Sequence, residues 1–139
     1  FIYRHNKKYC PICYYKKSQG EVIITTFLKN NNIDYQKEFI FSDLPQRRFD
    51  FFLPEEQIAI EFDGKQHFEY IPFLHNNNIE NFYLTQQRDQ EKNDFCLLNN
   101  IKLFRFSYID LDNLEEILQQ IFKEKSSTTI EKYLVKNMK

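Results

Sequence analysis

Three carboxylate residues fall in two neighbouring apolar runs of the sequence, at spacings that could hold a metal ion. Glu61 and Asp63 are two positions apart, so their side chains share one face if this run is a strand. A turn near Glu55 would bring Asp50 opposite Ile60 or Glu61 on a hairpin. Carboxylates that close repel one another in a partly buried site unless a hard cation such as Mg²⁺ or Mn²⁺ compensates them. Such a metal would activate water and stabilise the charge that builds on a phosphate, which is the chemistry of phosphodiester hydrolysis.

A plainer interpretation of this pattern also exists. Glu61 and Asp63 could end an edge strand on the solvent side, with Asp63-Gly64 serving as a turn, and an isolated E-x-D-G motif favours this interpretation. The expected position of Asp50 across the ribbon favours a site instead. His67, which closely follows the motif, favours it too, because histidine acts as a general acid or base near neutral pH.

The hydrophobic periodicity predicts the elements that would position these residues. Their expected order is α-β-β-β-α-β-α, in an α/β (α+β) domain with a central mixed sheet flanked by helices. Ser18 and Glu21 fit a capping box that opens the first helix, and the run Asn30-Asn31-Asn32 ends it. A long loop follows the third strand, and such loops are often functional. The expected ranges are helix 18–30, strands 33–42, 47–53 and 57–63, loop 65–79, helix 80–99, strand 101–106 and helix 112–124.

Side-chain alternation assigns a face to each residue of the expected strands. In strand 57–63, the core face carries Ile58, Ile60 and Phe62, and the opposite face carries Ala59, Glu61 and Asp63. In strand 47–53, one face carries Phe49, Phe51 and Leu53, and the other carries Arg48, Asp50 and Phe52. In strand 33–42, one face carries Tyr35, Lys37, Phe39 and Phe41, and the other carries Glu38 and Ile40.

The composition is that of an ordinary soluble domain. Of 139 residues, 42% are hydrophobic and 28% are charged, and the 15 Phe and 9 Tyr must build much of one core. No apolar run is long enough to span a membrane, and no secretory signal is recognisable. Three cysteines do not make a disulfide framework, so a reducing compartment is expected. Because the chain opens at Phe1 within a basic stretch, we expect a fragment whose upstream part is missing.

Cys10 and Cys13 make half of a zinc site. Tetrahedral zinc needs four ligands, and a C-P-x-C knuckle is commonly one of a pair. His5 is a weak further candidate, and Cys96 is expected in the core because its neighbours on a helix are apolar. Zinc binding is therefore expected only if an upstream C-x-x-C completes the site. On this basis the chain divides into a basic, irregular segment over 1–17, the main domain over 18–124, and a tail or weak helix over 125–139.

The runs R-F-D-F-F-L-P over 48–54 and I-E-F-D-G-K-Q-H-F over 60–68 resemble the restriction-endonuclease-like nucleases of the PD-(D/E)XK superfamily. The branch that they resemble contains nucleases of the very-short-patch-repair type and related homing endonucleases with an E-D-H-D type site. Weaker similarity extends to the C-P-x-C and S-x-G-E motifs upstream and to the Q-R-D, K-N-D-F and L-F-R-F motifs downstream. The resemblance thus covers residues 9–108.

The resemblance implies roles for the residues that match the superfamily motif. Asp50 matches its metal-binding aspartate, and Glu61 matches its second acidic ligand. Asp63, also expected near the metal, stands where many members carry the catalytic lysine. The work of that lysine would then fall to His67, to Lys92 on the following helix, or to a second metal ion.

Further matches have plainer alternatives. Glu21 matches a first-helix glutamate that holds a metal through water, with the capping box as an equally weighted alternative. Asp89 and Lys92 are one helical turn apart, so a surface ion pair is the default interpretation. Arg105 could reach a phosphate or close the edge of the sheet, and His75 is expected to be inert. The residues expected to contact DNA phosphates are Arg47, Arg48, Lys65 and Arg88.

The leading hypothesis is a Mg²⁺- or Mn²⁺-dependent endonuclease that cuts double-stranded DNA, of homing, repair or restriction type. The net charge of -1 does not oppose it, because bound metal ions reverse the field of an acidic site. One alternative is an inactive DNA-binding module of the same fold, and another is a zinc-organised protein-interaction domain. Asn-, Lys- and Ile-rich usage suggests an AT-rich genome, so we expect the protein inside a bacterium or a virus- or phage-infected cell.

Overall fold

The computed structural model describes residues 11–123, with side chains described from residue 19 onward. Its elements are α2 (Pro11–Asn30), β1 (Gln36–Phe39), β2 (Phe49–Leu53), β3 (Ile58–Asp63), the 3-10 helix η1 (Lys65–His67), α3 (Ile79–Leu98), β4 (Lys102–Ser107), the 3-10 helix η2 (Tyr108–Asn113) and α4 (Leu114–Lys123). This confirms the predicted order of helices and strands. The main difference in the second half is that η1 and η2 occupy parts of the expected loop and last helix.

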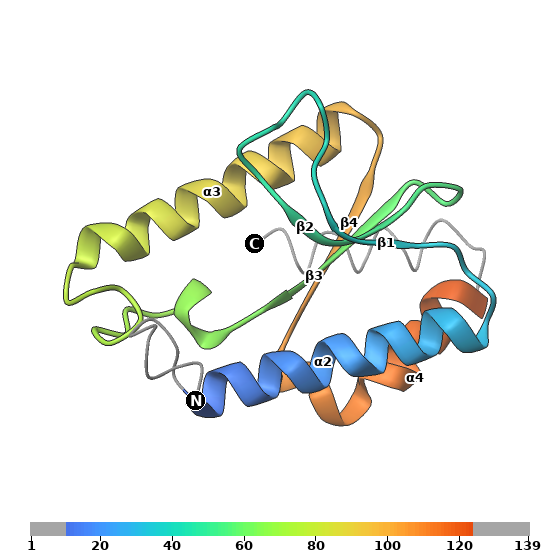
Figure 1. Cartoon of the computed structure of the whole chain (residues 1–139), viewed down its shortest axis with the longest axis horizontal. Helices are drawn as coiled ribbons and strands as arrows, with labels where there is room; N and C mark the ends of the chain where they lie inside the picture. Colours follow the sequence, from blue (N-terminus) through green and yellow to red (C-terminus); the bar gives the residue numbers. More distant parts are fainter. Residues whose placement is uncertain (1–10, 124–139) are drawn as a thin grey trace.

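The four strands form one mixed sheet in the order β1-β2-β3-β4. Neighbouring strands from β1 to β3 are antiparallel, whereas β3 and β4 are parallel and are joined through α3. In Figure 1, α3 lies on one side of the sheet and α2 and α4 lie on the other. The predicted central mixed sheet flanked by helices is therefore confirmed, and the protein is of the α+β class.

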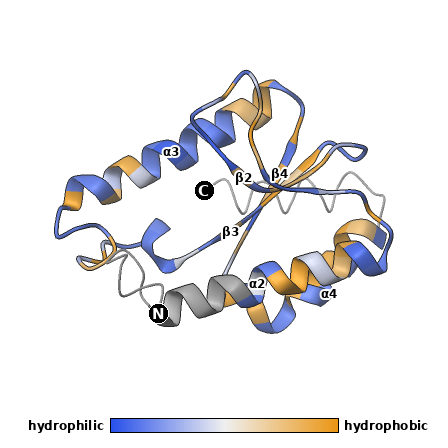
Figure 2. Ribbon diagram, viewed as in Figure 1, coloured by the Kyte–Doolittle hydropathy of each residue, from blue (hydrophilic) through white to orange (hydrophobic). Residues whose placement is uncertain are grey.

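The sheet separates two apolar clusters. The cluster facing α2 and α4 contains the inward side chains of β3 and β4, including Ile60, Phe62 and Phe104. The smaller cluster faces α3 and includes Phe49, and α3 contributes Cys96 as its buried member there. Figure 2 shows the consequence, since hydrophobic residues follow the strands, α2 and α4, while α3 is mostly hydrophilic. No helix within residues 11–123 combines the length and apolar content needed to cross a membrane.

The predicted alternation is confirmed in β3 and for Phe51, Phe52 and Leu53 of β2, but it is wrong at Phe39, Phe41 and Phe49. Phe39 and Phe49 are paired across β1 and β2, and both pack in the cluster under α3. Phe51 instead belongs to the opposite cluster, and the ammonium group of Lys37 lies 5.5 Å from the centroid of its ring. In β1 the physical reason lies at Glu38, whose φ of 52° interrupts the extended backbone between Lys37 and Phe39 and so places these two side chains on opposite faces.

Helix α2, the first helix among the described residues, begins at Pro11, not at Ser18 as predicted. Proline is favoured in the first helical turn, where its missing N–H leaves no hydrogen bond unmade. Ser18 and Glu21 therefore lie inside α2, so the capping-box interpretation is wrong, and residues 11–17 are helical rather than irregular. Cys10, the side chain of Cys13 and the expected tail over 125–139 lie outside the described residues, so the zinc half-site stays a prediction.

Gly20 brings α2 against β3. A Cβ atom at this position would overlap the ring of Phe62, so only glycine permits the observed approach. The glycine is costly inside a helix, by roughly 0.5–1 kcal/mol relative to alanine, which indicates that this packing distance matters to the fold. It fixes the helix over the part of β3 that carries Glu61 and Asp63.

Candidate functional site

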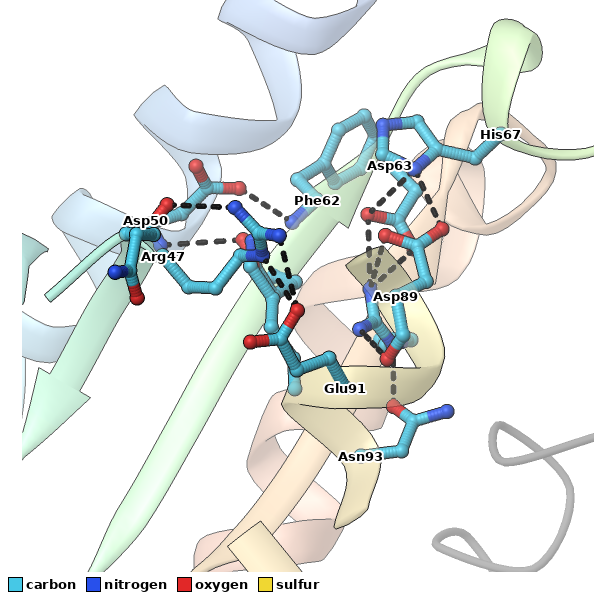
Figure 3. Close-up of polar contacts among 12 residues, drawn as sticks. Arg47, Asp50, Phe62, Asp63, His67, Asp89, Glu91 and Asn93 are labelled. Atoms are coloured by element: carbon cyan, nitrogen blue, oxygen red, sulfur yellow. Dashed lines mark hydrogen bonds and ion pairs between the residues drawn. The ribbon is translucent and has the colours of Figure 1, made fainter. Parts of the chain in front are cut away.

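Asp50 and Glu61 meet where the pairing of β2 with β3 ends. The last residue pair at this end is Phe51 opposite Ile60, and the same register places Asp50 opposite Glu61, as predicted. Beyond this pair, side-chain carboxylates accept hydrogen bonds from main-chain amides of the neighbouring strand, in place of main-chain carbonyls. The main-chain amide of Asp50 donates to Oε2 of Glu61 at 3.1 Å, and the amide of Phe62 donates to Oδ2 of Asp50 at 2.8 Å (Figure 3). The two carboxylates are thereby held side by side at the open end of the hairpin.

Glu61 is poorly suited to carry a negative charge alone. Its side chain is almost completely buried, with 3% of the residue exposed. Burial, and then the neighbouring charge of Asp50, raise the pKa of Glu61 to about 8. Lys92 opposes this shift, since its ammonium group contacts Oε1 of Glu61 and lies 5.2 Å from the centroid of the Phe49 ring. A second cation near Asp50 would stabilise the ionised form further.

Asp63 does not join Asp50 and Glu61 in a shared metal cluster, contrary to the geometry expected of the three carboxylates. Both oxygens of Asp63 accept from Nη1 of Arg105, at 3.0 and 3.3 Å, and both side chains are buried. Within residues 19–123, the group of potential ligand atoms that converges within 4.8 Å is formed instead by Asp63, His67 and Asp89.

His67 is held mainly by Asp89. Its Nδ1 atom lies 2.8 Å from Oδ2 of Asp89 and 3.8 Å from Oδ1 of Asp63 (Figure 3). Burial alone would lower the pKa of His67, but the hydrogen bond to Asp89 and the charges of both carboxylates outweigh it and raise that pKa. Burial alone would raise the pKa of Asp89, but the hydrogen bond with His67 and the nearby positive charges outweigh it and lower that pKa. The pair is thus ordered, with the charged forms favoured on both partners.

The surface beside these groups is basic. A pocket of about 520 Å³ opens there, lined by Gln46, Arg47, Arg48, Gln66, His67, Thr85, Arg88, Asp89 and Lys92. Arg48 and Arg88 are exposed at its rim, whereas Arg47 is ion-paired with Glu91 at 2.9 Å. Three of the four residues expected to contact DNA therefore line the pocket. The fourth, Lys65, is paired with Glu69 at 3.0 Å and lies outside the lining.

Glu21 and His75 lie outside the ligand group formed by Asp63, His67 and Asp89. Glu21 is half-buried in the interior of α2, beside the glycine that packs on β3. It is not part of the converging ligand group found among the described side chains. His75, which was expected to be inert, is buried, and its ring nitrogens bond to the main chain at Ile71 and Gln66. It anchors the loop that leads from η1 to α3.

The structure gives Asp89, Lys92 and Arg105 partners that the sequence did not predict. Asp89 and Lys92 do not form the surface pair expected by default, since each turns to a partner outside its helix. Arg105 is buried and reaches the site from β4, instead of reaching a phosphate or closing the sheet. The spacing of Asp89, Lys92, Asn93 and Cys96 matches one face of a helix, and that signal predicts that they face the sheet together.

No family model matches the chain, and no solved structure matches it. A 59-residue segment is 36% identical to an uncharacterized protein, 307L, of Invertebrate iridescent virus 6. The match covers 42% of this chain and 29% of the viral protein, so the chain spans less than a third of that relative.

Proposed function

We propose that this domain is a divalent-metal-dependent nuclease that hydrolyses phosphodiester bonds in double-stranded DNA, with a restriction-endonuclease-like site. The observation that carries the proposal is the Asp50–Glu61 pair. Two carboxylates are held together at the open end of a hairpin, one is buried with a raised pKa, and a pocket rimmed by arginines lies beside them. Acidic pairs next to basic grooves suit a cation that must act on a phosphate.

The donor set fits a hard dication. Asp50 and Glu61 would hold Mg²⁺ or Mn²⁺ through carboxylate oxygens, the ligands these ions prefer. When both are ionised, Asp50 and Glu61 carry more negative charge than Lys92, the cation that contacts Glu61, can offset, whereas Asp63 and Asp89 face Arg105 and His67. A bound metal would supply a Lewis acid for the phosphate and a water of lowered pKa.

Lys92 would serve in place of the strand lysine of the superfamily, whose position is taken here by Asp63. Its ammonium group contacts Glu61, and its side chain also lines the pocket. From there it can counter the negative charge that grows on a phosphate during cleavage. The replacement is physically reasonable because the position of the charge, not its origin in the sequence, determines its effect.

His67 would transfer a proton. Asp89 holds Nδ1 of the ring, which leaves Nε2 for a proton transfer within the pocket that His67 lines. An imidazole fixed by a carboxylate keeps one tautomer and one orientation, so it needs no rearrangement before reaction. The exposed Arg48 and Arg88 would bind the phosphates of the DNA on either side.

A second candidate is an inactive DNA-binding module of the same fold. The observation in its favour is that Lys92 and Arg105 already pair with two of the carboxylates, so part of the acidic charge is compensated within the protein. Against it, a module that only binds DNA gains nothing from carboxylates beside its phosphate-binding arginines, since they repel the phosphates.

Supercoiled plasmid separates the two candidates. The protein is incubated with plasmid and Mg²⁺, Mn²⁺ or EDTA, together with Asp50→Asn, Glu61→Gln and a control, Glu56→Gln, in the exposed hairpin turn. The nuclease proposal predicts nicked or linear products with either metal, none with EDTA, and loss of cleavage in the two site variants but not the control. Retarded DNA without cleavage under every metal condition supports the binding module instead.

We also propose that the protein acts inside a bacterium or a virus-infected cell. The similarity to a viral protein is in keeping with the second of these settings.

A further inference from the structure

Arg105 is the central residue of a buried polar network beside the proposed metal site. Its guanidinium group donates from Nη1 to both oxygens of Asp63, from Nη2 to the main-chain carbonyl of Asp89 at 3.1 Å, and from Nε to Oδ1 of Asn93 at 3.0 Å. The residue is 8% exposed. Arg105 therefore joins three elements, β4 to the end of β3 and to the middle of α3.

The same contacts argue against a metal ion at Asp63. The converging atoms of Asp63, His67 and Asp89 have the composition of a metal site, but Arg105 already supplies a cation there. A dication would have to displace or lie against a buried guanidinium group, which cannot lose its charge. The two negative charges of Asp63 and Asp89 can be balanced by the positive charges of Arg105 and of protonated His67. The group is then electrically neutral without a metal.

We infer that Arg105 and Asp63 are positioning residues that hold the His67–Asp89 pair in place for cleavage, and that Asp63 is not a metal ligand. The inference rests on the proposed nuclease function. The sequence had suggested that Asp63 lies at the metal and that Arg105 contacts a phosphate or closes the edge of the sheet. The inference instead gives both residues a positioning role.

The geometry explains how the support operates. Arg105 fixes the helix backbone at the carbonyl of Asp89, so the carboxylate that orients His67 starts from a defined point. Its second contact, to Asp63, holds that carboxylate 3.8 Å from Nδ1 of His67. Nδ1 of His67 thus has one hydrogen-bonded carboxylate, that of Asp89, and a second carboxylate, that of Asp63, at ion-pair distance. Only the fork of an arginine can make these bonds at once, which a lysine cannot.

A metal titration tests the assignment of Asp63 without requiring activity. Mn²⁺ binding is followed by electron paramagnetic resonance for the wild type, Asp63→Asn, His67→Gln and Asp50→Asn. We expect Asp63→Asn and His67→Gln to keep the affinity within about threefold and Asp50→Asn to weaken it at least about tenfold, because direct ligands dominate affinity. If Asp63→Asn or His67→Gln weakens Mn²⁺ binding as much as Asp50→Asn does, the inference is wrong.

Kinetics test the role of Arg105 in the folded enzyme. We expect Arg105→Lys to lower kcat on plasmid about 10- to 100-fold with little change in KM, and to shift the limb of the pH–rate profile that reports His67. Asp63→Asn should shift the same limb, and the double variant should be no slower than the slower single variant, because both act through one pair. An unchanged pH profile, or independent multiplying losses in the double variant, would overturn the inference.

The two levels of proposal fail differently. If the wild type binds Mn²⁺ but cuts no DNA, the nuclease function fails while the metal assignment of Asp63 is still decided by the titration. In that event the ring of His67 is titrated by NMR, where Arg105→Lys and Asp63→Asn must each move its pKa if they position it. Thermal unfolding followed by circular dichroism checks that every variant folds. If Arg105→Lys does not fold, Asp63→Asn, which preserves the side-chain shape, serves as the test instead.

Discussion

The ammonium group of Lys92 on α3 contacts the carboxylate of Glu61 on β3, across 31 positions of sequence. This contact brings a cation to the one strand pair that carries Asp50 and Glu61. In the proposed nuclease, Lys92 would take the role of the lysine that the resemblance predicts at the position of Asp63.

Replacing Lys92 by methionine should separate catalysis from metal binding. We expect Lys92→Met to lower the cleavage rate about 100-fold, because an electrostatic contact to the reacting phosphate is lost. Mn²⁺ affinity should stay the same or rise, since a competing cation leaves Glu61. Single-turnover cleavage and Mn²⁺ titration measure the two effects. The matched control is Lys65→Met, whose lysine pairs with Glu69 on the surface. A weaker Mn²⁺ affinity with unchanged cleavage would contradict the assignment.

The metal-free protein should lose stability as pH rises. Glu61 keeps its proton up to about pH 8 in the folded protein but releases it near 4.5 when unfolded. Between these values the folded state binds more protons, so the free energy of unfolding falls as pH increases. We expect the Tm in EDTA to drop by at least about 4 °C from pH 5 to pH 8.

Two comparisons check the origin of that pH dependence. Glu61→Gln should flatten the curve between pH 4.5 and 6, and Mg²⁺ should restore the Tm at pH 8. His67, whose pKa is also raised, adds a loss in the same direction at higher pH, so a residual slope above pH 6.5 is expected in Glu61→Gln. A Tm in EDTA that rises steadily from pH 5 to 8 would show that Glu61 is ionised throughout.

Removing the imidazole should affect chemistry and leave metal binding intact. His67→Gln and Asp89→Asn are each expected to slow cleavage about 100-fold or more, because a positioned acid or base contributes that much. The acidic limb of the pH–rate profile should disappear in His67→Gln and move to lower pH in Asp89→Asn, since Asp89 holds the pKa of His67 up. Cleavage rates from pH 5.5 to 9 give the profile, and a full rate in Asp89→Asn would argue against the pair.

The rim arginines should set the salt dependence of DNA binding. Each of Arg48→Ala and Arg88→Ala is expected to reduce the slope of log K against log salt by about 0.9, the value for one phosphate contact. Arg47→Ala should do less, because Arg47 is held by Glu91 in the free protein. Fluorescence anisotropy on a catalytically inactive background measures the slopes. Equal slopes in Arg48→Ala and the parent would place the DNA elsewhere.

Alanine should destabilise the protein more at Gly20 than at Gly64. Helix propensity alone would make Gly20→Ala stabilising, but the added methyl overlaps the ring of Phe62, so we expect a loss of about 1–3 kcal/mol. At Gly64 the added methyl meets only the end of the flexible Gln66 side chain, so the cost there should stay under about 1 kcal/mol. Urea unfolding measures both, and a stabilised Gly20→Ala would mean that α2 can move away from β3.

Local patterns predicted the frame of the fold. The helix over 79–98 and the hairpin that sets Asp50 opposite Glu61 follow from periodicity and a short turn, which act over a few residues. The errors have local causes too. A capping-box motif marked Ser18 as a helix start although Pro11 provides an earlier one, and the positive φ of Glu38 reversed faces that strict alternation had assigned.

The partners of the site residues could not be predicted in the same way. Asp63 and Arg105 are 42 positions apart, and their pairing depends on β3 and β4 lying parallel and adjacent in the sheet. The turn of Lys92 towards Glu61 likewise requires α3 to cover that face of the sheet. Sequence spacing indicated which residues share a helix face, but only the packing of elements decides which charge meets which.

The central claim is that Asp50 and Glu61 jointly hold one divalent metal ion. Its most direct measurement is the stoichiometry and affinity of Mn²⁺ binding to the wild type, Asp50→Asn, Glu61→Gln and the double variant, followed by electron paramagnetic resonance at pH 8. We expect one bound ion in the wild type, an affinity at least about tenfold lower in each single variant, and no bound ion in the double variant. Wild-type affinity in both single variants, or no bound ion in the wild type, would contradict it.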